Sequence, residues 1–157
     1  MTIKFYAIGG YNEVGKNMSA LQIDDEIFIL DCGLYIPAVV ELEEKRYNAA
    51  MLREVDALPD DVPLKNLRDK VKGIIIGHAH LDHVGFAPYI ASKYDCSIIG
   101  TPFTLEVLKR LIEDKELRLN NKLISLNPNS SLRISDNINI EFINMTHSTL
   151  QTVMVVI

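Results

Sequence analysis

The sequence predicts an α/β fold in which two β-sheets pack together and helices lie outside them. Strand-like runs open the chain, strand-like and helix-like runs alternate in the middle, and strand-like runs close it. This order suits layered sheets with helices on the outside. With 157 residues, the chain is long enough for one ordinary domain with a sizeable core.

The chain opens with three predicted strands, at residues 3–8, 17–23 and 26–30. The first alternates in hydrophobicity and is rich in β-forming residues. A glycine-rich turn at residues 9–15 follows it, and Asp24-Asp25 forms a tight hairpin between the second strand and the third.

The next segment, residues 34–63, is polar and interrupted by prolines, with helix-like composition within 43–56. Residues 64–70 predict a short helix. The apolar run 72–76 predicts a buried strand.

Helices and strands alternate after that buried strand. Residues 85–94 predict a helix and residues 97–100 a strand. Thr101 and Pro102 have the residue types of an N-cap and a first helical position for a helix over 103–117. Four strands close the chain, at residues 122–126, 131–134, 137–143 and 152–157.

Composition limits the class of protein. An apolar content of 48% and a charged content of 24% are those of a soluble globular protein. No apolar run approaches the roughly 20 residues of a membrane helix, and the first residues lack a secretory signal. Two distant cysteines, Cys32 and Cys96, favour a reducing, cytoplasmic location. The net charge of −5 argues weakly against a broad basic surface for nucleic acid, but two bound divalent ions would add about four positive charges locally.

The run from Gly77 to Gly85 (GHAHLDHVG) holds the strongest functional signal. It places three of the four histidines and an aspartate within six positions, namely His78, His80, Asp82 and His83. Histidine and aspartate are common ligands of zinc, and of manganese where oxygen is favoured. A single histidine is most often a satisfied structural residue, but four such ligands between glycines predict a metal site.

The spacing predicts two adjacent metal ions. The run follows a buried strand, and α/β proteins place their sites at such strand ends. In an extended segment His78 and His80 point to one side, and a turn then redirects Asp82 and His83. We therefore expect His78 and His80 to hold one ion, and Asp82 and His83 the other.

Two further residues follow strand-like runs. His147 alone would be a structural histidine, but the first ion lacks a third protein ligand, so we expect His147 to supply it. Asp31 could cap the next turn, or it could accept a hydrogen bond from a ligand histidine and orient it. Near the glycine-rich turn, Lys16 and Asn17 could reach a substrate phosphate or form part of a solvated turn.

These motifs resemble those of a known superfamily. His78-x-His80-x-Asp82-His83 resembles the signature of the metallo-β-lactamase superfamily, with Asp31 like its first motif and His147 like its third. The opening 9–18 (GGYNEVGKNM) resembles that of the ribonuclease J family, the β-CASP branch that acts on nucleic acid. Thr101-Pro102 also fits that branch.

The resemblance implies a four-layer αββα sandwich with two zinc ions, or manganese in some members. It implies hydrolysis of RNA phosphodiesters by a metal-bound hydroxide, with Asp82 and His83 in the catalytic centre. Family members are 5′-to-3′ exonucleases, often with endonuclease activity, in cytoplasmic RNA decay and processing. It further implies RNA as a partner and a homodimer for the full-length protein.

The sequence also departs from the family pattern. It stops inside an apolar strand, ten residues after His147, whereas natural termini are usually polar. The family's bridging aspartate, later histidines and β-CASP domain are absent. We therefore expect residues 1–157 to be the N-terminal part of a metallo-β-lactamase domain, with an incomplete sandwich and poor activity alone.

Two other functions remain open. The first is a small-molecule hydrolase of the same fold, such as a glyoxalase-II-like thioesterase or a lactonase, although the openings of those enzymes do not resemble residues 9–18. The second is a non-catalytic, metal-stabilised scaffold subunit. A flavo-diiron oxidoreductase is disfavoured, because those proteins usually carry glutamate at the position of His80.

Overall fold

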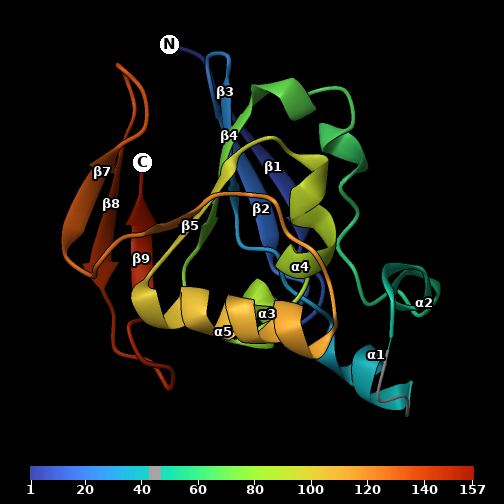
Figure 1. The fold of residues 1–157 in the computed structure, drawn as a ribbon. Helices are drawn as coiled ribbons and strands as arrows, with labels where there is room; N and C mark the ends of the chain where they lie inside the picture. The colour runs from blue at the N-terminus through green and yellow to red at the C-terminus, as the bar shows by residue number, and fades with distance from the viewer. Residues whose placement is uncertain (43–46) are drawn as a thin grey trace.

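The computed structural model describes residues 1–42 and 47–157, which form two β-sheets and a set of helices (Figure 1). The larger sheet has six strands in the order β1 (Ile3–Gly9), β2 (Met18–Ile23), β3 (Glu26–Leu30), β4 (Val71–Ile76), β5 (Ser97–Gly100) and β6 (Leu123–Ser125). The smaller sheet has the order β7 (Ser130–Arg133), β8 (Asn139–Asn144) and β9 (Val153–Val156). The predicted α/β class and all nine predicted strands are confirmed, with boundaries shifted by one or two residues.

Strand direction in the larger sheet sets the position of the functional residues. The pairs β1–β2 and β2–β3 are antiparallel, whereas β3–β4, β4–β5 and β5–β6 are parallel. Leu30 pairs with Ile75, and Ile76 pairs with Gly100. The segments that follow β3, β4 and β5 therefore leave the sheet at the same edge, where ligands bind in open α/β sheets.

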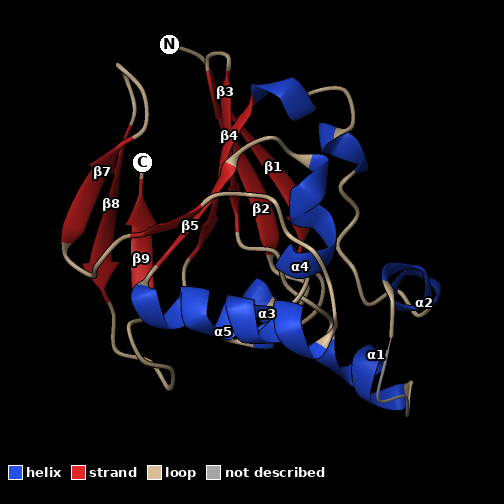
Figure 2. Cartoon of the chain, in the orientation of Figure 1, coloured by secondary structure: helices blue, strands red, loops and turns tan. Residues whose placement is uncertain are grey.

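The described residues form five α-helices (Figure 2), which are α1 (Ile36–Glu41), α2 (Ala49–Glu54), α3 (Leu81–Val84), α4 (Ala87–Ile90) and α5 (Pro102–Asp114). Three 3-10 turns complete the set, at Val62–Leu64, Arg68–Lys70 and Ala91–Lys93. Within the described residues, no helix is long and apolar enough to cross a membrane.

The helix predicted over 85–94 is wrong in its start and its continuity. Helical structure begins at Leu81 and includes Asp82 and His83, and it stops after Val84 before α4 begins. Pro88 lies in the first turn of α4. A proline lacks the N–H that would continue the preceding helix, so Pro88 starts a new helix instead.

The segment 34–63 also differs from the prediction of an irregular region with one helix. An additional helix, α1, forms around Pro37, which lies in its first turn, where proline is tolerated. The predicted helical stretch 43–56 appears as α2, and its residues 43–46 lie outside the described residues. The short helix predicted over 64–70 is replaced by two separate 3-10 turns.

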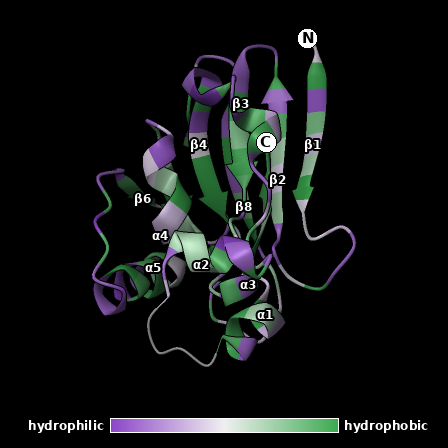
Figure 3. Cartoon of the chain, turned by 90° about the vertical axis from the view of Figure 1, so that its right-hand side faces the viewer, coloured by the Kyte–Doolittle hydropathy of each residue, from purple (hydrophilic) through white to green (hydrophobic). Residues whose placement is uncertain are grey.

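Both faces of the larger sheet are buried at its centre. Ile27, Ile29, Ile74 and Ile76 belong to a core cluster that includes buried residues of every α-helix. On the opposite face, Phe28, Ile75 and Ile99 pack with Ile140 and Phe142 of β8. A parallel strand buried on both faces needs a continuous apolar run. The green carboxyl end of β4 in Figure 3 is such a run.

The smaller sheet covers only part of the larger one. Ile3 and Phe5 of β1 are 56% and 57% exposed. Ile3 pairs with Ile23, which packs in the cluster between the sheets, so the exposed Ile3 lies on the same face. The described residues thus form three layers of the four-layer αββα sandwich, and the predicted incomplete fold is confirmed.

Candidate metal centre

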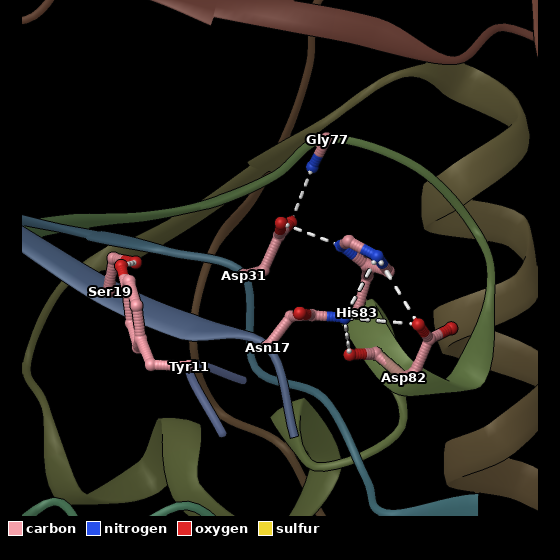
Figure 4. Close-up of polar contacts among 7 residues, drawn as sticks. All are labelled: Tyr11, Asn17, Ser19, Asp31, Gly77, Asp82 and His83. Carbon is pink, nitrogen blue, oxygen red and sulfur yellow. Dashed lines mark hydrogen bonds and ion pairs between the residues drawn. The ribbon is translucent and has the colours of Figure 1, made fainter. Parts of the chain in front are cut away.

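The candidate site lies at the edge of the larger sheet where β3 and β4 end. Asp31 follows β3, the histidine run follows β4, and His147 lies in the connection between β8 and β9. The sheet brings together segments that are far apart in the chain, and Figure 4 shows the side chains of Asp31, Asp82 and His83 converging.

Three histidines form a group that can hold one metal ion. One nitrogen each of His78, His80 and His147 lies within 4.8 Å of the others. The ring centroids of His78 and His147 are 4.8 Å apart, and those of His80 and His147 are 4.9 Å apart. Three imidazoles and one open position form a ligand set that zinc uses in catalytic sites. The structure therefore brings the three residues predicted for the first ion together.

His78 shows that this group suits a metal. Its side chain is buried, and its Nε2 atom has no hydrogen-bond partner among the described residues. Burial, followed by the charge of His83, lowers the pKa of His78 to about 4, so its imidazole is neutral at physiological pH. A buried nitrogen without a partner is costly. A metal ion would satisfy it, because neutral imidazole is the ligand form of histidine.

Asp31 holds the ring of His83. Its Oδ2 lies 2.8 Å from Nδ1 of His83, and its Oδ1 accepts a hydrogen bond of 2.8 Å from the N–H of Gly77. Burial lowers the pKa of His83, but the hydrogen bond and charge of Asp31 outweigh burial and raise it above its ordinary value. The geometry matches the interpretation in which Asp31 orients a ligand histidine.

Asp82 and His83 form the second pair of expected ligands, and they lie beside the first group. Nε2 of His83 is 3.4 Å from Oδ2 of Asp82. The ring centroids of His83 and His78 are 3.9 Å apart. Asp82 and His83 therefore lie close to the three-histidine group, and a second ion held by them stays a prediction.

Lys16 and Asn17 contact the protein itself in this structure. The Lys16 ammonium lies 3.0 Å from Oδ2 of Asp56 and 3.7 Å from Oε1 of Glu13, and the residue is 9% exposed. Asn17 Nδ2 lies 3.0 Å from Oδ2 of Asp82 and 3.0 Å from Nε2 of His83. The contact of either residue with a substrate phosphate stays a prediction.

Two residues of the loop that carries His147 escaped the sequence analysis. Ser148 Oγ lies 3.3 Å from Nε2 of His80. Gln151 Oε1 accepts a hydrogen bond of 2.8 Å from the N–H of Phe103, at the start of α5. No spacing in the sequence indicates either contact, because each joins segments that only the fold brings together.

A cavity of about 510 Å³ opens beside these side chains. It extends from the metal centre along the gap between the two sheets. Its polar wall includes Asp31, His78, His83 and His147, and its apolar wall includes Leu30, Ile75, Val153 and Val155. The candidate centre thus lies beside a cavity that is lined by residues of both sheets.

Comparison with curated proteins finds ribonuclease J sequences. The chain is 40% identical to "Ribonuclease J" of Methanocaldococcus jannaschii, with 100% of this chain and 36% of the relative covered. It is 39% identical to "Ribonuclease J" of Pyrococcus abyssi, with 99% and 35% covered. "Ribonuclease J 2" of Staphylococcus aureus is 31% identical, with 93% and 24% covered. The chain thus spans about a third of the length of the two archaeal relatives.

Solved structures share the fold. The metallo-β-lactamase fold protein YhfI of Bacillus subtilis matches with a TM-score of 0.58 and 18% identity, over 99% of this chain and 57% of that chain. A metallo hydrolase of Ignicoccus hospitalis matches with a TM-score of 0.57 and 17% identity, over 98% and 53%. At these identities the likeness concerns the fold alone.

A model of one protein family matches most of the chain. The family is described as the metallo-beta-lactamase superfamily, and the match spans residues 11–139. That range holds the glycine-rich turn, Asp31 and the histidine run. The chain therefore belongs to the metallo-β-lactamase superfamily, and within it is similar to ribonuclease J.

Proposed function

We propose that this chain carries the metal centre of a ribonuclease that hydrolyses RNA phosphodiesters with two divalent ions, zinc or manganese. The observation that carries the proposal is the unpartnered Nε2 of buried His78 inside a group of three histidines. Similarity to ribonuclease J sequences at 31–40% identity supports RNA as the substrate.

Each site residue has a defined task in this proposal. His78, His80 and His147 hold the first ion, and Asp82 and His83 contribute to the second. When bound, two such ions would stabilise the attacking and the leaving oxygen of a phosphoryl transfer and would activate water. Asp31 binds Nδ1–H of His83 and so keeps the Nε2 lone pair free for a ligand.

The finer properties of the proposed enzyme follow from the resemblance and from the names of the relatives. We propose a 5′-to-3′ exonuclease with endonuclease activity, working in RNA decay and processing in the cytoplasm, with a β-CASP domain and a homodimeric full-length form. In this proposal only Asp82 and His83 supply ligands for the second ion. The 157-residue chain is therefore proposed to be poorly active by itself.

The test compares RNA with a small-molecule substrate. The full-length gene product is incubated with 5′-monophosphorylated RNA and, separately, with a thioester. We expect degradation of RNA that stops with a chelator, with His80→Ala and with Asp82→Asn. The matched control is Asp69→Asn, which removes an exposed carboxylate in the 3-10 turn Arg68–Lys70.

The outcomes separate the three functions. Thioester turnover without RNA loss would establish the small-molecule hydrolase. Binding of metal without turnover of either substrate would establish the scaffold subunit. For the chain alone, robust RNA hydrolysis by a purified 157-residue protein, lost in His80→Ala, would contradict the proposed poor activity.

A further inference from the structure

Asn17 lies between the two expected ligands of the second ion. Its Nδ2 is 3.0 Å from Oδ2 of Asp82, 3.0 Å from the carbonyl oxygen of Asp82 and 3.0 Å from Nε2 of His83. Figure 4 shows the amide of Asn17 pointing at both residues. We infer that Asn17 is a positioning residue for Asp82 and His83, an inference that rests on the proposed two-metal function.

The backbone of Asn17, like its side chain, is hydrogen-bonded to Asp82. The N–H of Asn17 donates to the carbonyl oxygen of Asp82 at 3.1 Å, and the N–H of Gly33 donates to the carbonyl oxygen of Asn17 at 3.0 Å. The carbonyl of Asp82 thus accepts from both the backbone and the side chain of Asn17. Asn17 is half-buried, and both its backbone and its amide group are already hydrogen-bonded. Its side chain therefore loses little further conformational entropy when it orients a neighbour.

Glycines make this close approach possible. Gly10 has a φ of +84°, and a Cβ there would lie 2.6 Å from Oδ1 of Asn17. A Cβ on Gly33 would lie 1.5 Å from the carbonyl oxygen of Asp82. The glycine-rich opening and the turn after β3 therefore leave the space in which Asn17 meets Asp82. Residues 9–18, which resemble the ribonuclease J family, thus place this amide against the candidate metal centre.

The chemistry of an amide suits this position. The NH₂ group of asparagine donates two hydrogen bonds, and three acceptors surround it. When an ion occupies the lone pair of His83 Nε2, the two amide hydrogens of Asn17 remain available to the carbonyl oxygen and to Oδ2 of Asp82. The hydrogen bond to Oδ2 then keeps the Asp82 carboxylate in one orientation. An aspartate of the same size could not donate, and its charge would repel that of Asp82.

The experiment measures divalent ions bound to the full-length gene product in zinc buffered by a competing chelator. The variants are Asn17→Asp and Asn17→Ala, and the matched control is Asn12→Ala, which changes an exposed asparagine of the same turn. Wild type and Asn12→Ala are expected to bind two ions. Both Asn17 variants are expected to retain the first ion and to bind the second about 10–100-fold more weakly, the usual loss for a residue behind a ligand.

The outcomes distinguish this inference from the function on which it rests. If wild type binds no second ion, the proposed two-metal function fails. If wild type binds two ions and both Asn17 variants bind them with unchanged affinity, the inference is overturned. Loss of RNA affinity without loss of metal would overturn it in favour of a phosphate contact. Loss of both ions together with the folded circular dichroism spectrum in Asn17→Asp would also overturn it, by showing a general structural role.

Discussion

The carboxylate of Asp31 joins both ends of the histidine run, because it bonds His83 Nδ1 at 2.8 Å and the N–H of Gly77 at 2.8 Å. His83 lies 52 positions from Asp31 in the chain, and the parallel pairing of β3 with β4 brings the two together. A single side chain therefore fixes where the run leaves the sheet and how its last histidine is turned.

Replacing Asp31 by asparagine is expected to weaken metal binding about 10–100-fold. Asparagine tolerates the left-handed backbone of residue 31, where φ is 60°, so the change removes the charge and one acceptor with little backbone strain. The measurement is zinc affinity in competition with a chelator.

Asp69→Asn serves as the control for Asp31→Asn, since Asp69 is exposed and lies in a 3-10 turn outside the candidate site. Equal zinc affinity in wild type and Asp31→Asn would contradict an orienting role for this carboxylate. Equal losses in both variants would point to a general effect of charge.

The position of the candidate metal centre could be predicted because it depends on local patterns. An apolar strand followed by closely spaced histidines predicts ligands at a sheet edge, and the structure brings His78, His80 and His147 together there. The alternation of strands and helices likewise indicated the layers of the fold. These features depend on periodicity and on the direction of parallel strands, both of which can be read from a single sequence.

The contacts around the ligands could not be predicted, because they join distant segments. Asn17 meets Asp82 across 65 positions, and Gln151 meets Phe103 across 48. The helix α1 that begins near Pro37 and the break before α4 at Pro88 were also missed, because each proline lies in a first helical turn. Proline in a sequence marks either a helix start or a loop, and tertiary packing decides between them.

Gln151 is expected to support the loop of His147 by capping α5. Its Oε1 accepts the N–H of Phe103, which has no partner inside the helix so close to its start. Gln151→Ala should lower the free energy of unfolding by about 1 kcal/mol, the usual value of a lost cap. Urea denaturation followed by circular dichroism measures it.

A matched variant separates the effect of the hydrogen bond to Phe103 from the effect of side-chain volume at position 151. Gln151→Glu retains an acceptor and adds a negative charge near a helix N-terminus, where negative charge is favourable. Its stability should equal or exceed that of the wild type. A destabilisation as large as that of Gln151→Ala would show that the hydrogen bond to Phe103 is not what matters.

Lys16 is expected to stabilise the glycine-rich turn through its ion pairs with Asp56 and Glu13. Lys16→Met keeps the aliphatic stem and removes the charge, so it should lower the free energy of unfolding by about 1 kcal/mol or less, because Asp56 is largely exposed.

The salt dependence of RNA binding tests whether Lys16 also contacts a phosphate. Removing one phosphate contact would reduce the slope of log K against log salt by roughly 0.7–1. We expect an unchanged slope in Lys16→Met, since the ammonium is already paired. A reduced slope would instead establish the phosphate contact that the sequence suggests.

Gly33 is expected to tolerate no side chain, since a Cβ there would lie 1.5 Å from the carbonyl oxygen of Asp82. The obstacle is backbone that also carries expected metal ligands, so Gly33→Ala must push α3 away from β3. We expect a loss of stability of about 3 kcal/mol or more, at the upper end of overpacking costs, together with loss of zinc binding.

Gly73→Ala is the matched control, because a Cβ there first meets Ile99 Cδ1 at 3.5 Å, an ordinary contact. That variant should be neutral or more stable by up to about 1 kcal/mol, since alanine has less backbone entropy to lose. Similar unfolding curves for the two variants would show that the contact between Gly33 and Asp82 does not hold α3 in place.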